Sequence, residues 1–399
     1  MNKYWHNHVF SAELPYEKDQ IVSLFLRERF ERLDSFIMSL GQMTILPPSS
    51  LHSYHNGKLQ RSQTYAKNYL NAAGFGLYFY YIPKALMFVV IDLLRALSSI
   101  HFTCDIFFAQ HFLPAFIAVI LRKLGVLRCK KIVFWMFDFF IIPPEITRSL
   151  YYRGMDLMQG YLRNHVDELW YTTPRLLECD RERFGGLPKA VTVRITQGCF
   201  FRRIKSPTPP ILPPLRLAFL GSLRDNNAIF ESIDAVQSCI TNGMQVELHI
   251  IGSGPEEIRA KEYVKQKNLS SAIQFYGFED RGDQIAKIFS KCHLGIALHP
   301  ADPYGPNWYL TSGKFRRYIS QRLPVITTSV PYFSKYIYDY RAGLVVDNDP
   351  DEVSRALKTV YNNPALLETM RSGVDTLYNL FQADTVLEKS FLDLIKTIH

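Results

Sequence analysis

The sequence lacks closely spaced cysteine pairs. It contains six cysteines, and no two of them form a CxxC pattern. This spacing excludes a zinc ribbon and a CxxC redox motif. Isolated cysteines are typical of a reducing compartment, where they pack as small core residues, so we expect a cytoplasmic protein. The six are Cys104, Cys129, Cys179, Cys199, Cys239 and Cys292.

Long uncharged hydrophobic runs are also missing. The first residues, MNKYWHNHVF, do not show the basic-then-apolar order of a signal peptide. The most apolar stretch, 77–97, is interrupted by Lys84, Asp92 and Arg95. A membrane-spanning helix needs about 20 nearly uncharged residues. We therefore predict a buried strand and a buried helix there, rather than a membrane span.

Several ligand-binding motifs are absent. The Walker pattern GxxxxGK[ST], zinc fingers and RNP motifs do not occur, so we expect no nucleic-acid partner. We also find no DxD pair placed to hold a metal on a diphosphate and expect no metal site. The sequence Asp347-Asn-Asp349 is better explained as a helix start, because Pro350 and Glu352 complete a capping pattern after Asp349.

Basic residues are in excess, with 46 Lys and Arg against 37 Asp and Glu and a formal net charge of +9. This balance favours anionic partners, such as a phosphorylated ligand or a membrane surface, but is equally compatible with a merely soluble basic protein. One basic cluster surrounds Phe134 and Trp135 and suits contact with a peripheral membrane surface; the alternative is an ordinary solvated face. Its members are Arg122, Lys123, Arg128, Lys130 and Lys131.

The chain is long enough for two domains at 399 residues. In its second half, short apolar runs alternate with helical spacing, which predicts an α/β fold with a parallel sheet covered on both faces. The predicted strands are 215–221, 246–252, 273–278, 294–299, 325–328 and 343–347.

The first half repeats this alternation less regularly. We predict strands at 104–110, 131–137, 166–171 and 191–195, a helix at 113–124, and a long polar loop at 49–67. The proline-dense run RRIKSPTPPILPP, 202–214, cannot continue a helix or a central strand and marks a boundary. The predicted division is a domain at 1–203, a linker at 204–214, a domain at 215–373 and a C-terminal helix at 374–399 that packs near the first domain.

Six segments resemble the donor-binding domain of family 4 glycosyltransferases in order and spacing. They are LAFLGSL, ELHIIGSGPE, IQFYGFED, LGIALHP, SGKFRRYISQRLPVITT and AGLVVDNDPDEVSRAL. CDIFFAQH, FWMFD, VDELWYTT and VRITQGCF more loosely resemble the family's acceptor domain. The resemblance implies two Rossmann-like domains facing a cleft, the GT-B fold. It also implies a nucleotide-sugar donor, a glycan or lipid-linked acceptor, retention of configuration, and no cofactor.

Parallel strands present their carboxyl ends to ligands, and glycines there allow backbone to approach phosphate closely. Gly221, Ser222 and Gly252-Ser253-Gly254 follow two predicted strands, although tight structural turns would explain them equally well. The resemblance places the nucleobase at Tyr276, Gly277 and Phe278, and places donor phosphates near Thr311, Ser312 and Lys314. The alternative for Phe278 is core packing.

Lys314 begins a predicted helix, where a cation beside the helix N-terminus would stabilise a leaving diphosphate. The alternative is an exposed lysine on the helix surface. The sequence departs from the family at its two glutamates, whose places are taken by Tyr309 and Arg317. Arg224 lies two positions after the family's phosphate-binding arginine. These departures leave open a catalytically inactive relative that binds a partner or a glycan.

In the first half, His111 and Asp138 follow predicted strands. His111 would orient the donor sugar or hold the acceptor, and Asp138 would accept a hydroxyl proton or bond a sugar hydroxyl. The structural alternatives are a hydrogen-bonded, partly buried ring and a turn residue. A sugar-nucleotide epimerase is a third functional class, but the paired acids and histidine that it requires cannot be placed in the sequence.

Overall fold

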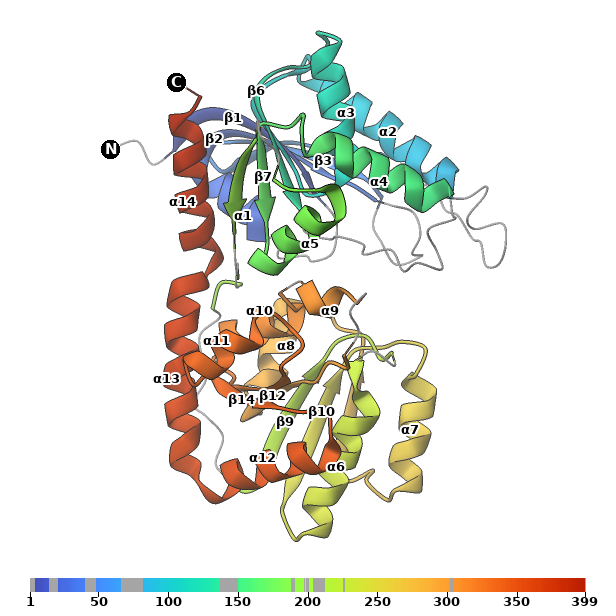
Figure 1. Cartoon of the computed structure of the whole chain (residues 1–399), viewed down its shortest axis with the longest axis vertical. Coiled ribbons are helices and arrows are strands. Elements are labelled where there is room, and N and C mark those ends of the chain that lie inside the picture. Colours follow the sequence, from blue (N-terminus) through green and yellow to red (C-terminus); the bar gives the residue numbers. More distant parts are fainter. Residues whose placement is uncertain are drawn as a thin grey trace. The chain divides into compact units, whose positions relative to one another are not determined.

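The computed structural model describes residues 4–13, 21–39, 48–65, 82–136, 150–187, 191–196, 198, 201–203, 212–224, 227–301, 305–309 and 311–398. The chain divides into two compact units (Figure 1). The first unit comprises Met1–Thr196 and Leu387–His399, and the second comprises Gln197–Val386. The contacts thus divide after Thr196, whereas most of the linker predicted at 204–214 lies outside the described residues.

The first unit is built on a sheet with the strand order β4-β3-β2-β1-β5-β6-β7-β8. From β2 through β8, neighbouring strands in this order run parallel. The order reverses between β1 and β5, the arrangement of a Rossmann-like sheet. The strands are β1 (Trp5–Glu13), β2 (Phe30–Ile37), β3 (Ser50–His55), β4 (Lys58–Thr64), β5 (Thr103–Ala109), β6 (Arg128–Met136), β7 (Glu168–Tyr171) and β8 (Thr192–Ile195).

The loop predicted at 49–67 is wrong, because β3 and β4 form an antiparallel hairpin on the edge of this sheet. The turn is Asn56-Gly57, with positive φ angles of 48° and 73°. Asn-Gly is the preferred pair for a two-residue hairpin turn. The polar composition was misleading because an edge strand exposes most of its side chains, as β4 does.

The helices of the first unit include α14, which returns from the C-terminal end of the chain. Phe391 on α14 packs against Phe25, Phe108 and Trp170, with ring centroids 5.8, 5.3 and 4.9 Å away. The helices are α1 (Ile21–Arg29), α2 (Ile82–Ser99), α3 (Phe112–Lys123), α4 (Leu150–Leu162), α5 (Pro174–Phe184) and α14 (Ala383–Lys396).

The apolar stretch at 77–97 forms helix α2 from Ile82 onward. The strand predicted at its start falls on residues 77–81, outside the described part. Among the helices that the structure describes, none has both the length and the apolar character that a membrane crossing requires.

The second unit has a parallel sheet with the order β11-β10-β9-β12-β13-β14 (Figure 1). This confirms the parallel α/β architecture predicted for the second half. Its order reverses between β9 and β12. The strands are β9 (Leu215–Leu220), β10 (Val246–Ile251), β11 (Ile273–Gly277), β12 (Leu294–Ala297), β13 (Val325–Thr328) and β14 (Gly343–Val346).

Helices enclose an apolar core on each face of this sheet. They are α6 (Ile229–Thr241), α7 (Glu257–Gln266), α8 (Gly282–Phe289), α9 (Pro306–Tyr309), α10 (Gly313–Ser320), α11 (Ser334–Asp339), α12 (Pro350–Asn362) and α13 (Pro364–Phe381). Asp349 caps α12 as predicted, since its side chain accepts hydrogen bonds from the Asp351 and Glu352 amides. Glu352 accepts from the Asp347 amide rather than from that of Asp349.

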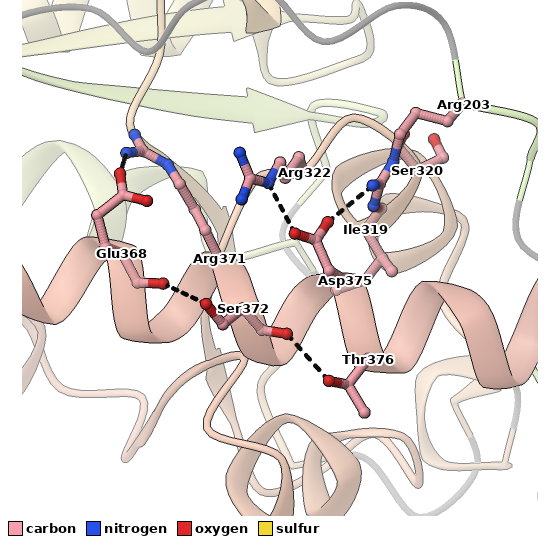
Figure 2. A network of polar contacts seen from close by, with 9 residues as sticks. All are labelled: Arg203, Ile319, Ser320, Arg322, Glu368, Arg371, Ser372, Asp375 and Thr376. Carbon is pink, nitrogen blue, oxygen red and sulfur yellow. Dashed lines mark hydrogen bonds and ion pairs between the residues drawn. The ribbon is translucent and has the colours of Figure 1, made fainter.

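A polar network fixes α13 within the second unit (Figure 2). Asp375 on α13 accepts hydrogen bonds from Arg203 and Arg322 at 2.7 and 2.9 Å. The Arg203 guanidinium also lies 4.2 Å from the ring centroid of Tyr378. One carboxylate on α13 therefore holds both the segment before β9 and the turn before β13.

Candidate functional site

The carboxyl ends of β9 and β12 lie side by side in the second unit, where the strand order reverses. Gly221 follows β9, and His299 lies two residues beyond β12. Open α/β sheets bind ligands at such a reversal point, because loops leave it in opposite directions. The residues around Gly221 and His299 are therefore the first place to look for a site.

The glycine turns at this edge pack directly against one another. A Cβ on Gly252 would lie 1.9 Å from the Gly221 carbonyl oxygen, and one on Gly254 would lie 2.4 Å from the Leu223 carbonyl oxygen. Gly221 and Gly252 also have φ angles near +143°, which only glycine adopts readily. Backbone packing alone thus requires glycine at 252 and 254. These two glycines are evidence about the turn, and any role toward a ligand stays a prediction.

Lys314 is buried, so the alternative of an exposed surface lysine is wrong. Its residue is 6% exposed, and its stem passes over Gly221, where a Cβ would lie 2.9 Å from Lys314 Cε. The ammonium lies 4.6 Å from the ring centroid of Phe219, and no described residue accepts a hydrogen bond from it. Burial lowers the pKa of Lys314 to about 7.

Two more buried polar groups without a described hydrogen-bond partner occur near Lys314 in the chain. His299 is 1% exposed, and neither of its ring nitrogens has a hydrogen-bond partner within the described part of the chain. The same is true of the Thr311 hydroxyl. Burial, followed by the charge of Lys314, lowers the pKa of His299. Buried polar groups in proteins are nearly always paired, so such a set indicates that a polar ligand completes them.

We call His299, Thr311 and Lys314 the polar triad. Lys314 lies in the first turn of α10, and Thr311 precedes this helix by two residues. A helix N-terminus offers free backbone N–H groups and a positive dipole end. Together with one ammonium and one hydroxyl, these groups favour a small multivalent anion, and phosphate is the group that this geometry binds best.

His299 ends the segment LGIALH but was not among the site residues predicted from the sequence. The available signal was its position directly after a predicted strand, the same signal that singled out His111. The structure adds what the sequence could not show, namely that the side chain is completely buried and shares its surroundings with Lys314.

The other predicted donor residues differ in their surroundings. Ser222 is exposed and accepts from the Asn227 amide at 3.0 Å, and Arg224 is exposed. The Tyr276 hydroxyl hydrogen-bonds Gln274 and His249, so it is engaged within the sheet. Phe278 is 62% exposed, which overturns core packing as its explanation and leaves an apolar surface at the end of β11.

The two residues in place of the family's glutamates are both buried. Tyr309 on α9 is 2% exposed, and Arg317 on α10 is 8% exposed. The Arg317 guanidinium stacks on the ring of Phe201, 3.9 Å from its centroid. Ser312, at the N-cap position of α10, is also buried. Arginine at 317 gives this edge a second buried cation instead of a carboxylate.

In the first unit, His111 caps helix α3. Its Nδ1 accepts a hydrogen bond from the Leu113 amide at 3.2 Å, and burial lowers the pKa of His111 to about 4. The imidazole is therefore neutral at physiological pH and has one nitrogen in use. Asp138 lies outside the described residues, so its predicted role stays a prediction.

The edge around His111 also contains a buried carboxylate that the sequence analysis missed. Glu13, at the end of β1, is 1% exposed, and burial raises its pKa. Three serine hydroxyls donate to it, from Ser11 at 2.6 Å, Ser23 at 2.7 Å and Ser35 at 3.1 Å. Glu13 thus ties β1, α1 and β2 together.

Two members of the predicted basic cluster form ion pairs. Arg122 pairs with Asp167, and Lys130 lies 3.0 Å from Asp105. A search of the described residues finds no group of three or more His, Cys, Asp or Glu side chains placed to hold a metal.

Residues 214–363 match the family model described as glycosyl transferases group 1. No curated protein sequence matches the chain. Among solved structures, sucrose-phosphate synthase from Thermosynechococcus elongatus is 14% identical with a TM-score of 0.64, covering 98% of this chain and 100% of that one. HepE from Anabaena, in complex with UDP and glucose, is 11% identical with a TM-score of 0.64, covering 98% and 99%.

The lipopolysaccharide outer core galactosyltransferase WaaB is 11% identical with a TM-score of 0.57, covering 96% of this chain and 99% of that one. At these identities the structures show the fold alone. They confirm the predicted fold of two Rossmann-like domains, and the family match confirms the resemblance stated for the second half.

Proposed function

We propose that this protein transfers a sugar from a nucleotide-sugar donor to a hydroxyl group. Its second unit matches the family model of glycosyl transferases group 1, which supports this class of reaction. The polar triad at the reversal point of the second sheet is the observation that carries the proposal. Its buried ammonium suits a diphosphate, the charged part of a sugar nucleotide. HepE was solved with UDP and glucose, which supports the same class of ligand.

In this proposal, the donor diphosphate lies between Gly221 and the N-terminus of α10. Lys314 is its counter-ion, and Thr311 and the α10 amides donate hydrogen bonds. As the glycosidic bond to the donor breaks, negative charge grows on the leaving phosphate, and a preformed cation stabilises that charge. The other predicted donor residues, from Ser222 and Arg224 to Phe278, surround the nucleotide.

We further propose that the first unit binds the acceptor, a glycan or a lipid-linked saccharide, near His111 and Asp138. Configuration is retained, with the leaving phosphate itself accepting the hydroxyl proton. The protein acts in the synthesis of a cell-surface polysaccharide or glycoconjugate in the cytoplasm, at the cytoplasmic face of a membrane. Lys131 of the basic cluster would face the anionic lipid.

The transfer is proposed to be metal-independent, because Lys314 supplies the charge that a divalent ion supplies elsewhere. Isothermal titration with UDP, GDP and CMP would first identify the nucleotide. Hydrolysis of the matching sugar nucleotide, with and without EDTA, would then test catalysis. Hydrolysis that survives EDTA supports the proposal, and loss restored by manganese contradicts the metal-free step.

A catalytically inactive relative remains the second candidate, favoured by Tyr309 and Arg317 in place of two acids. The same measurements separate the two. Nucleotide binding without hydrolysis or transfer to any acceptor would support the inactive relative, and absence of all nucleotide binding would contradict the enzyme.

A further inference from the structure

Two cysteines that are 25 positions apart in the chain become neighbours in the first unit. Cys104 on β5 and Cys129 on β6 are direct register partners in a parallel strand pair. Side chains of register partners project from the same face of a sheet, and adjacent strands lie about 4.8 Å apart. This separation falls within the range of about 4.4–6.8 Å between the Cα atoms of disulfide-bonded cysteines.

The two thiols belong to residues that are neighbours in the strand register. A hydrogen bond joins them, raising the pKa of Cys104 and lowering the pKa of Cys129. The Arg122 guanidinium lies close enough to hydrogen-bond the Cys129 sulfur and further lowers its pKa. Cys104 is therefore the thiol that keeps its proton, and Cys129 is the better nucleophile.

Both thiols line a cavity of about 490 Å³. Cys104 is only 5% exposed, whereas Cys129 is half-buried and accessible from the cavity. The wall carries three basic side chains, Arg32, Arg128 and Lys130, and one carboxylate, Asp105, which pairs with Lys130 at 3.0 Å. The cavity therefore has an excess of positive charge next to the reactive sulfur.

We propose that Cys104 and Cys129 form a redox-active dithiol that small anionic disulfides oxidise within this cavity. His8 and Asp105 also line the cavity, but among the described residues no group of three or more His, Cys, Asp or Glu side chains is placed to hold a metal, which favours thiol exchange over metal binding. Arg32 and Arg128 attract the carboxylates of the oxidant, so a disulfide of the glutathione class suits the cavity. The site is independent of the proposed glycosyl transfer.

The reaction consists of two exchanges. The Cys129 thiolate attacks one sulfur of the oxidant, forming a mixed disulfide and releasing the first thiolate. Cys104 then loses its proton and attacks the Cys129 sulfur, forming the Cys104–Cys129 disulfide and releasing the second thiolate. The protein dithiol is oxidised by two electrons, the oxidant is reduced to two thiols, and the two protein protons end on them.

The test uses the reduced full-length protein, treated with oxidised glutathione and mapped by peptide mass spectrometry. We expect a Cys104–Cys129 crosslinked peptide, formed before Cys179, the half-buried thiol on α5, reacts. Cys104→Ser should stop at one glutathionyl group on Cys129, and Cys129→Ser should leave Cys104 reduced. Modification of Cys179 without a Cys104–Cys129 crosslink would overturn the proposal.

A charge-reversal variant tests the role of the cavity. Arg128→Glu should slow oxidation by glutathione disulfide about tenfold, while oxidation by cystamine, which is cationic, should not slow. Unchanged oxidation rates with both oxidants would show that the basic side chains of the cavity do not attract the oxidant. Thermal unfolding of each variant in reducing buffer verifies that the fold is retained.

Discussion

The carboxyl edges of the two sheets both carry buried polar side chains, but these side chains differ in their hydrogen bonding. In the first unit, Glu13 receives three serine hydroxyls and His111 is bonded to the Leu113 amide. In the second unit, the side-chain nitrogens of His299 and Lys314 are buried and have no hydrogen-bond partner among the described residues. At the first edge Glu13 and His111 are bonded within the unit, although the buried Thr172 hydroxyl, directly after β7, has no hydrogen-bond partner among the described residues. Because buried polar groups are nearly always paired, this difference favours the second edge as the site of the donor anion and leaves the first edge to the proposed acceptor.

The largest expected effect is on catalysis by Lys314→Ala. If the ammonium stabilises the departing diphosphate, its loss should lower turnover by roughly 100-fold or more. The charge acts more strongly in the transition state than on the bound donor, so KM should change less than kcat. Steady-state kinetics with the matching sugar nucleotide measures both.

Lys358→Ala is the matched control, because Lys358 is an exposed lysine on helix α12 of the same unit. It should keep the turnover of the wild type. If Lys314→Ala also keeps the wild-type turnover, the donor site does not lie at α10. The difference in hydrogen bonding between the two edges would then be unrelated to catalysis.

Substitutions of Glu13 at the first edge should lower the free energy of unfolding and leave nucleotide affinity unchanged. Glu13→Ala leaves three serine hydroxyls, two of them buried, without their acceptor and should cost about 2 kcal/mol of unfolding free energy. Glu13→Gln keeps the volume and one acceptor oxygen, so it should cost less. Urea denaturation measures both variants. A change in nucleotide affinity in Glu13→Ala would show that Glu13 does more than hold the three serines.

The sequence was sufficient to predict the second unit almost completely. Its strands read as apolar runs such as LRLAFLG and VELHIIG, and Pro350 with its neighbours marked a helix start. Near the N-terminus the same approach failed, because β4 is exposed and polar and only Asn56-Gly57 signals the hairpin. Periodicity predicts elements that bury one face, and an edge hairpin buries little.

The site was only partly predictable, for a related reason. Lys314 could be identified from its position at the start of a predicted helix, but its burial depends on Phe219 in β9 and on Gly221 directly after that strand, about 95 residues earlier. The same holds for Cys104 and Cys129, which seemed isolated in the sequence until the strand register paired them. The register between two strands cannot be predicted from the local sequence pattern of either strand.

His299 should contribute to donor affinity at the second edge. If a ring N–H donates to a phosphate oxygen, His299→Ala should weaken nucleotide binding about tenfold, the scale of a hydrogen bond to a charged group. His299→Gln should restore part of the affinity through its amide donor. Calorimetry with the matching nucleoside diphosphate measures this. Equal affinity in wild type and His299→Ala would show that the unpartnered ring is not a ligand.

Lys314→Met should gain stability in the absence of nucleotide. Methionine fills the same volume without the cost of burying an ammonium, so the free energy of unfolding at pH 6 should be about 1–3 kcal/mol higher than in wild type.

The folded-state pKa of Lys314, about 7, lies below that of an unfolded lysine. The unfolded chain therefore binds more protons between these two values, and wild-type stability from this group rises with pH across that window. The advantage of Lys314→Met should be largest below pH 7 and shrink toward pH 10, as measured by thermal unfolding without nucleotide. Adding the nucleotide should reverse the order, because a bound diphosphate stabilises the protein that carries the charge more strongly. If Lys314→Met is less stable than wild type at pH 6, the lysine already has a partner in the empty protein, and the second edge is as complete as the first.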